Sequence, residues 1–126
     1  MTASLTIYGI PNCDTMRKAR AWLTGQGVPF VFHDYRKDGL ERSRLEGWVE
    51  RLGWEKLLNR AGTTFRRLAP EQRDGLDAAR AVALMLEHPA MIRRPVLEGP
   101  GLLLVGFRPD DYAAALSGLS DPDQAS

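Results

Sequence analysis

The strongest constraint on the fold is a strand pattern, a helix pattern and a second strand pattern that follow one another at the start of the chain. Residues 5–8 are apolar, β-branched or aromatic, and Gly9 ends this first strand. From Thr15 onward apolar residues recur at helical spacing, and Gly27 is suited to end the helix. Residues 30–33 form the next strand pattern. Because strand–helix–strand connections are right-handed crossovers, the two strands are predicted to pair in parallel.

The rest of the chain adds a helical block, one more helix, a strand pair and a last helix. We predict a turn at 36–41, helices at 45–52 and 54–58, a polar loop at 59–68, a helical turn at 70–75, a helix at 78–88 capped by Asp77, strands at 91–98 and 101–107, and a helix at 108–119. This order is the thioredoxin arrangement: an α/β, thioredoxin-like fold with a small mixed β-sheet and a helical insertion. One domain is predicted over residues 1–119, with a disordered tail over 120–126.

The single cysteine, Cys13, lies at the turn between the first strand and the first helix. Helix N-termini and nearby cations lower the pKa of a thiol, so Arg17 and Lys18 favour the thiolate while Asp14 opposes it. The turn position by itself leaves both a reactive thiol and an inert, buried one open. Three neighbouring residues are candidate caps of the helix: Asn12, Asp14 and Thr15.

Composition excludes several classes of function. With 17 basic and 16 acidic residues, the chain has no broad attraction to nucleic acid or membrane surfaces. One cysteine excludes an intrachain disulfide and a cysteine-based zinc site, and His33 and His88 lack ligand-like spacing, so no metal is expected. There is no signal-peptide pattern and no apolar run of the ~20 residues that a membrane span needs, so the cytosol is the predicted location.

Several segments in order along the chain resemble one family. The segment "YGIPNCDTMRKA" resembles the active-site segment of the arsenate reductase-like family of thioredoxin-fold proteins. That family includes small glutathione-dependent thiol reductases and Spx-type regulators that bind RNA polymerase. The segments "FHDYRKDGL", "LGWEKLLN", "GTTFRRL", "EHPAMIRRPVL" and "VGFRPDDY" fit the same family in order. The combination of the single-cysteine turn with HP-x4-RP and G-F-R-P is most similar to the single-cysteine thiol reductase branch.

The resemblance implies roles for individual residues. Cys13 matches the family's nucleophile, Arg94 matches the arginine before the family's cis-proline, here Pro95, and Arg108 matches an oxyanion-binding arginine. Asn12 is a further candidate substrate-binding residue. The pKa of Cys13 is predicted to be lowered, mainly by the helix end, with the two arginines assisting. The simpler alternative for each arginine is a solvated or salt-bridged surface charge.

Two positions depart from the pattern of the arsenate reductases, and a third departs from that of the dithiol members. Those enzymes carry a further arginine where this chain has Asn59, and the adjacent Arg60 is the candidate substitute. Gly9 replaces a histidine, and Met16 stands where dithiol members have a second cysteine. The departures at Asn59 and Gly9 weigh against arsenate as the specific substrate, and Met16 leaves the chain without a resolving thiol.

The resemblance implies a thiol-dependent oxidoreductase that uses glutathione as co-substrate and binds no cofactor tightly. A thiolate that attacks an oxyanion or a disulfide meets negative charge, which guanidinium groups stabilise with a planar fork of donors. Without a second cysteine, an external thiol must resolve the intermediate on Cys13. Two other functions stay open: a regulator that binds RNA polymerase without turnover, and a non-catalytic binding module of the same fold.

Overall fold

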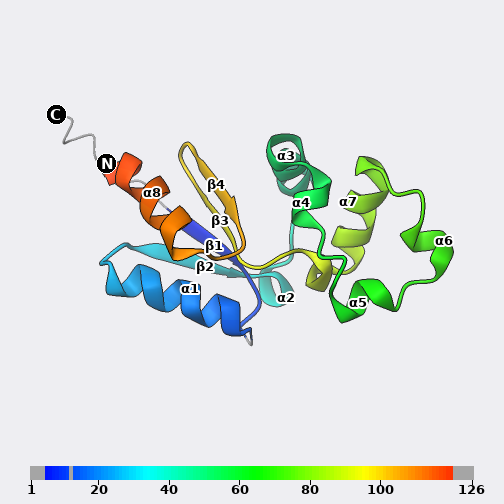
Figure 1. Cartoon of the computed structure of the whole chain (residues 1–126), viewed down its shortest axis with the longest axis horizontal. Coiled ribbons are helices and arrows are strands. Elements are labelled where there is room, and N and C mark those ends of the chain that lie inside the picture. The colour runs from blue at the N-terminus through cyan, green and yellow to red at the C-terminus, as the bar shows by residue number, and fades with distance from the viewer. Residues whose placement is uncertain (1–4, 12, 121–126) are drawn as a thin grey trace. The chain divides into compact units, whose positions relative to one another are not determined.

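The computed structural model describes residues 5–11 and 13–120 (Figure 1). The chain divides into two compact units. The sheet unit comprises the described residues up to Asp34 together with those from Arg94 onward, and the helical unit runs from Tyr35 to Arg93. The single domain over residues 1–119 remains a prediction. The predicted tail lies, beyond Ser120, outside the described residues.

The sheet unit is built on the predicted small mixed sheet. Its elements are β1 (Leu5–Gly9), α1 (Asp14–Gly25), β2 (Phe30–Asp34), β3 (Val96–Gly99), β4 (Leu102–Val105) and α8 (Pro109–Ser120). The strand order is β2-β1-β3-β4, in which β1 runs parallel to β2 and antiparallel to β3, and β3 and β4 form a hairpin. Figure 1 shows the early strand β1 beside the late strand β3. The parallel pairing of Leu5 with Phe30 confirms the predicted crossover.

A hydrophobic cluster joins the sheet to both helices of this unit. Leu5 and Ile7 lie on one face of β1, as the period of two in a strand requires. Met16, Ala19 and Leu23 recur at intervals of three and four and form the buried stripe of α1. Each fully buried aliphatic side chain of this kind contributes about 1.5–3 kcal/mol. The later strands and the last helix complete the cluster with Leu97, Leu102 and Tyr112.

The helical unit contains the remaining helices. They are α2 (Tyr35–Asp38), α3 (Arg42–Leu52), α4 (Trp54–Leu57), α5 (Thr63–Arg66), α6 (Pro70–Arg73), α7 (Ala78–Glu87) and the short 3₁₀ helix η1 (Pro89–Met91). The predicted cap of α7 is confirmed, because the Asp77 carboxylate accepts a hydrogen bond from the Arg80 N–H at 2.9 Å. Gly53 ends α3 with a φ of +90°, a conformation that favours glycine. The largest fully buried side chains of the unit are those of Trp48, Leu45, Leu57, Leu58, Met85, Met91 and Ile92.

Two short helices lie in segments that were predicted to be a turn and a loop. The polar loop predicted over residues 59–68 includes α5, because Phe65 turns inward and is buried while the polar residues around it stay near the surface. The turn predicted over residues 36–41 begins instead as α2, in which Tyr35 is buried. In both cases the burial of one aromatic side chain, which depends on distant parts of the chain, overrides the local polar pattern.

The strand predicted over residues 91–98 is shorter than expected. Its first part forms η1 and an irregular stretch, and β3 begins only at Val96. Proline has no backbone N–H and cannot donate to a strand ladder, so Pro95 is a natural boundary for β3. Arg94 and Pro95 therefore lie just outside the sheet, at the entrance to β3.

Candidate active site

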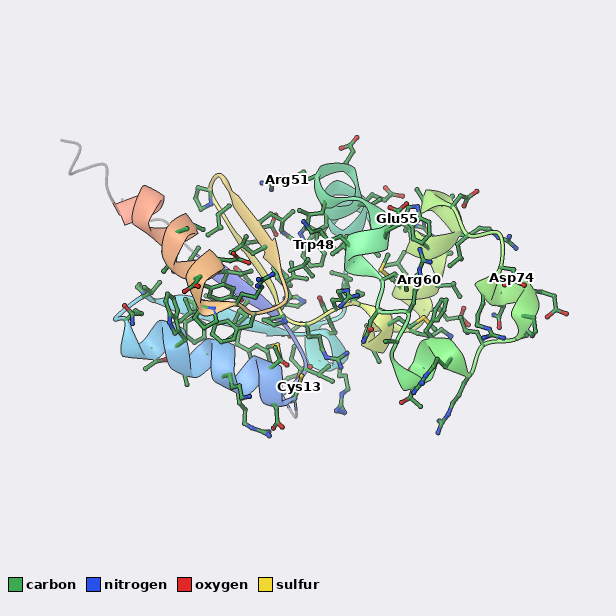
Figure 2. The ribbon with its side chains drawn as sticks, in the orientation of Figure 1. Cys13, Trp48, Arg51, Glu55, Arg60 and Asp74 are labelled. Atoms are coloured by element: carbon green, nitrogen blue, oxygen red, sulfur yellow. The ribbon has the colours of Figure 1, made fainter. Side chains whose placement is uncertain are left out.

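Cys13 is the N-cap residue of α1, directly after the loop that leaves β1 (Figure 2). Its backbone is extended (φ −138°, ψ 128°), and its carbonyl accepts a hydrogen bond from the Arg17 N–H at 3.0 Å. The predicted caps Asp14 and Thr15 are therefore wrong, because both already belong to the helix. The third candidate, Asn12, lies outside the described residues. The N-cap position puts the Cys13 side chain at the positive end of the helix dipole.

The pKa of the Cys13 thiol is lowered from its ordinary value, as predicted. Partial burial is the largest influence and acts in the opposite direction, since it disfavours the charged thiolate. The backbone N–H of Met16, the side chain of Arg94 and the backbone N–H of Thr15 stabilise the thiolate and together outweigh burial. The positive charge of Arg94 adds to their effect. The site therefore favours the nucleophilic form of the thiol.

The charges of Arg17 and Asp14 largely offset each other. Their side chains form an ion pair between adjacent turns of α1, and both are well exposed to solvent. The attraction expected from Arg17 and the repulsion expected from Asp14 are thus both reduced at the sulfur. Among the described residues, Arg94 is the charged side chain that lowers the pKa of Cys13.

Arg94 and Pro95 belong to the second stretch of chain in the sheet unit, which begins at Arg94. Arg94 is half-buried, with its Nε atom shielded from solvent, whereas the adjacent Arg93 is exposed. The Arg94–Pro95 peptide bond is cis, as the resemblance implied. The Pro95 carbonyl accepts a hydrogen bond from the Gly106 N–H at 2.8 Å. The sheet unit therefore brings together Cys13 and Arg94, two predicted site residues that are far apart in the sequence.

Gly9 and Met16, two positions at which the chain departs from patterns in the family, are physically coupled. A Cβ atom at Gly9 would lie 2.3 Å from the Sδ atom of Met16 and 2.9 Å from its Cε atom. Met16 is fully buried, so its side chain has little room in which to move aside. A residue larger than glycine at position 9 is thus incompatible with the present position of the Met16 side chain.

Replacing Gly9 with alanine is expected to lower the free energy of unfolding by about 1–3 kcal/mol, the usual cost of overpacking a core. Urea denaturation would measure the change. Gly25→Ala is the matched control, because a Cβ there meets no atom within 4 Å. In a Met16→Ala background the cost of Gly9→Ala should shrink, since the blocking sulfur is gone. Equal costs in both backgrounds would contradict the coupling.

The remaining predicted arginines have other partners. Arg108 is 82% exposed, and its Nε atom lies 3.7 Å from an Asp111 carboxylate oxygen. Within the described part of the chain, the groups that lower the pKa of Cys13 do not include Arg108, so its predicted assistance to the thiolate is not found. Arg60, labelled in Figure 2, belongs to the helical unit. Its guanidinium carbon lies 5.0 Å from the centre of the Trp54 ring.

Sequence reasoning predicted that the free N–H groups at the helix end would lower the pKa of Cys13, but it did not name the two residues that supply them. The N–H groups of Thr15 and Met16 face the start of the helix, and only the expected helix boundary could have pointed to them. Among the described residues there is no group of three histidine, cysteine, aspartate or glutamate side chains placed to hold a metal ion. None of the described helices is both long and apolar enough to cross a membrane.

Comparison with known sequences identifies relatives along almost the whole chain. The model of the ArsC family matches residues 8–115. An uncharacterised protein of Haemophilus influenzae is 38% identical over 113 residues, which cover 90% of this chain and 99% of that protein. Global transcriptional regulator Spx 1 of Lactococcus lactis is 31% identical over 114 residues, which cover 89% of this chain and 88% of the regulator.

Solved structures with the same fold include two with more than half of their residues identical. A protein named YFFB is 54% identical with a TM-score of 0.87, over 89% of this chain and 98% of that one. An arsenate reductase (ArsC) related protein from Brucella melitensis is 55% identical with a TM-score of 0.73, over 88% and 92% of the two chains. These similarities confirm the thioredoxin-like fold. The chain belongs to the ArsC family.

Proposed function

We propose that this protein is a thiol-dependent oxidoreductase that uses glutathione as its co-substrate, with Cys13 as the nucleophile. The observation that carries the proposal is the lowered pKa of Cys13, to which the helix N–H groups and Arg94 both contribute. A structural cysteine needs no such stabilisation of its thiolate, whereas a nucleophilic one does. Membership of the ArsC family supports the same class of chemistry.

The proposed reaction consists of two thiol–disulfide exchanges. The Cys13 thiolate attacks the glutathione sulfur of a mixed disulfide, an S–S bond forms between protein and glutathione, and the substrate leaves as a thiolate. A second glutathione thiolate then attacks the glutathione sulfur bound to Cys13. This step releases oxidised glutathione and restores the Cys13 thiolate. Because the chain has a single cysteine, the second thiol must come from solution.

Arg94 has a different task at each stage of this cycle. In the resting protein its side chain stabilises the Cys13 thiolate. When the sulfur enters a disulfide its negative charge is lost, and the guanidinium becomes available to a carboxylate of the bound glutathione. A guanidinium can meet a carboxylate with two parallel hydrogen bonds, which fixes its orientation. Arg94 is therefore proposed to bind glutathione as well as to activate Cys13.

Four further residues are proposed to contact the anionic substrate. Arg108 is suited to an outer position, because its ion pair with Asp111 is exposed and therefore weak enough to exchange for a carboxylate of the substrate. Pro95 follows Arg94 directly and would border the bound glutathione. Asn12 and Arg60 are proposed from the sequence alone.

A second candidate function is transcriptional regulation, because relatives about 30% identical are named global transcriptional regulator Spx. Such a protein would bind RNA polymerase, as the family resemblance suggests, without turning over a substrate. The lowered pKa of Cys13 favours the enzyme, since a partner-binding surface does not require a reactive thiolate. A non-catalytic binding module is disfavoured on the same ground.

A titration of the isotopically labelled protein with reduced glutathione, followed by NMR, tests the proposal. We expect shifts at the amides of Cys13, Arg94 and Val96. Arg94→Lys should weaken binding about tenfold, or about 1.4 kcal/mol, because a point charge cannot make the forked contact. Arg93→Lys is the matched control, since that neighbouring side chain is exposed.

Other outcomes would replace the proposal. If glutathione leaves these amides unperturbed while immobilised RNA polymerase retains the protein, the regulator becomes the better assignment. If neither ligand binds, the non-catalytic binding module does. Equal weakening by Arg93→Lys and Arg94→Lys would remove the specific role of Arg94.

A further inference from the structure

Gly106 follows the last residue pair of the β3–β4 ladder and forms a backbone hydrogen bond with Pro95. The last residue pair of that ladder is Val96 with Val105, so Gly106 is the residue opposite Pro95. Its N–H donates to the Pro95 carbonyl at 2.8 Å and extends the ladder by one step. Because Pro95 has no N–H to give in return, this is the one ladder hydrogen bond that this pair can make.

The backbone of Gly106 makes that position possible. Its φ is +83°, in the left-handed region that L side chains rarely adopt. A Cβ at Gly106 would meet no atom within 4 Å. Glycine is therefore required here for its backbone conformation and not for space. The conformation turns the chain out of β4 immediately after the N–H that bonds to Pro95.

The carbonyl of Gly106 accepts a hydrogen bond from a residue of the last helix, α8. The buried Tyr112 hydroxyl donates to the Gly106 carbonyl at 3.5 Å, a long hydrogen bond. The Tyr112 ring packs edge-on against Phe107 and Trp22, with centroid distances of 4.8 and 5.7 Å. Gly106 thus links the packed rings of α1 and α8 to the backbone that carries Arg94.

We propose that Gly106 is a positioning residue of the thiol site, which holds the Pro95 carbonyl and thereby sets where the Arg94 side chain meets the Cys13 sulfur. This inference rests on the proposed function, in which that thiolate is the nucleophile. Arg94 directly precedes Pro95, so a displacement of the Pro95 backbone moves the guanidinium with it. Hydrogen bonds weaken steeply as the donor–acceptor distance and angle depart from their optimum, so a small displacement suffices.

The test compares Gly106→Ala with Gly101→Ala. Gly101 also has a positive φ, +68°, and also has no atom within 4 Å of its Cβ position, but it lies in the exposed β3–β4 turn. Both variants should lower the urea midpoint to a similar extent. Alkylation of Cys13 by iodoacetamide against pH is the second measurement. Only Gly106→Ala should raise the midpoint of that profile and slow alkylation at neutral pH about threefold.

Two further variants keep the test decisive. Gly106→Asn should retain the wild-type alkylation profile, because asparagine tolerates positive φ better than alanine. Arg94→Ala should raise the midpoint at least as far as Gly106→Ala. An unchanged profile in Gly106→Ala, or an equal shift in Gly101→Ala, would overturn the positioning role alone. An unchanged profile in Arg94→Ala would overturn both this role and the proposed role of Arg94 at the thiolate.

Discussion

Replacing Cys13 with serine is expected to abolish the covalent adduct that the protein forms with oxidised glutathione. The wild-type chain should gain one glutathione and no more, because it has one cysteine. A serine hydroxyl is not ionised near neutral pH and cannot displace a thiolate from a disulfide. Mass spectrometry of the intact protein after incubation with oxidised glutathione would measure both results.

Loss of the adduct in Cys13→Ser should not reflect loss of the fold. Cys13 is the N-cap of α1 and its side chain makes no capping hydrogen bond. Serine is among the best N-cap residues, and a good cap is worth about 1 kcal/mol relative to alanine. The variant should therefore unfold at a urea concentration equal to or above that of the wild type. A persistent adduct in this variant would show that glutathione attaches by another route.

The rate of adduct formation in the wild type should follow the thiolate. Because the pKa of Cys13 is lowered, the rate should rise with pH and level off below pH ~8.5, the ordinary pKa of a free cysteine. Below the Cys13 pKa the thiol is protonated and the rate should fall about tenfold per pH unit. A midpoint at the value of free cysteine would contradict an activated nucleophile.

Substituting Met16 with cysteine is expected to convert the stable glutathione adduct into a transient one. Met16 is at the third position of α1, one turn from the N-cap Cys13, and its backbone N–H already stabilises the Cys13 thiolate. A thiolate at position 16 could attack the Cys13 sulfur of the mixed disulfide. An S–S bond would form between positions 13 and 16, and glutathione would leave as a thiolate.

The final product of Met16→Cys should lack glutathione and be two hydrogens lighter than the reduced variant. Removing most of a fully buried methionine should also cost about 2–5 kcal/mol of stability, so unfolding must be monitored in parallel. Met16→Ala is the matched control, since it leaves a similar cavity without a thiol and should retain the adduct. If Met16→Cys retains glutathione as fully as Met16→Ala, a thiolate at position 16 does not reach the Cys13 sulfur.

Most of the elements and their order could be predicted from local patterns in the sequence. The apolar, β-branched and aromatic residues at 5–8 and 30–33, the helical spacing after Cys13 and the Asp77 cap are local patterns. Such patterns depend only on residues that are close together in the sequence. The right-handed crossover then required a parallel strand pair, which the Leu5–Phe30 register confirms. The ordered motifs around these elements were sufficient to identify the family.

Which residues stabilise the thiolate depends on how the sheet unit packs. Arg94 was one of three candidate arginines, and only packing in the sheet unit shows that it stabilises the Cys13 thiolate while Arg108 pairs with Asp111. Similarly, the buried ring of Phe65 produced α5 within a segment whose polar residues predicted a loop.

The coupling of Gly9 to Met16 and the hydrogen bond of Gly106 to Pro95 also lie beyond any local pattern. Each depends on distances between side-chain and backbone atoms of separate elements. Such distances follow from how the strands and helices pack, because a periodicity fixes which face of an element is apolar but not which atoms of another element it meets.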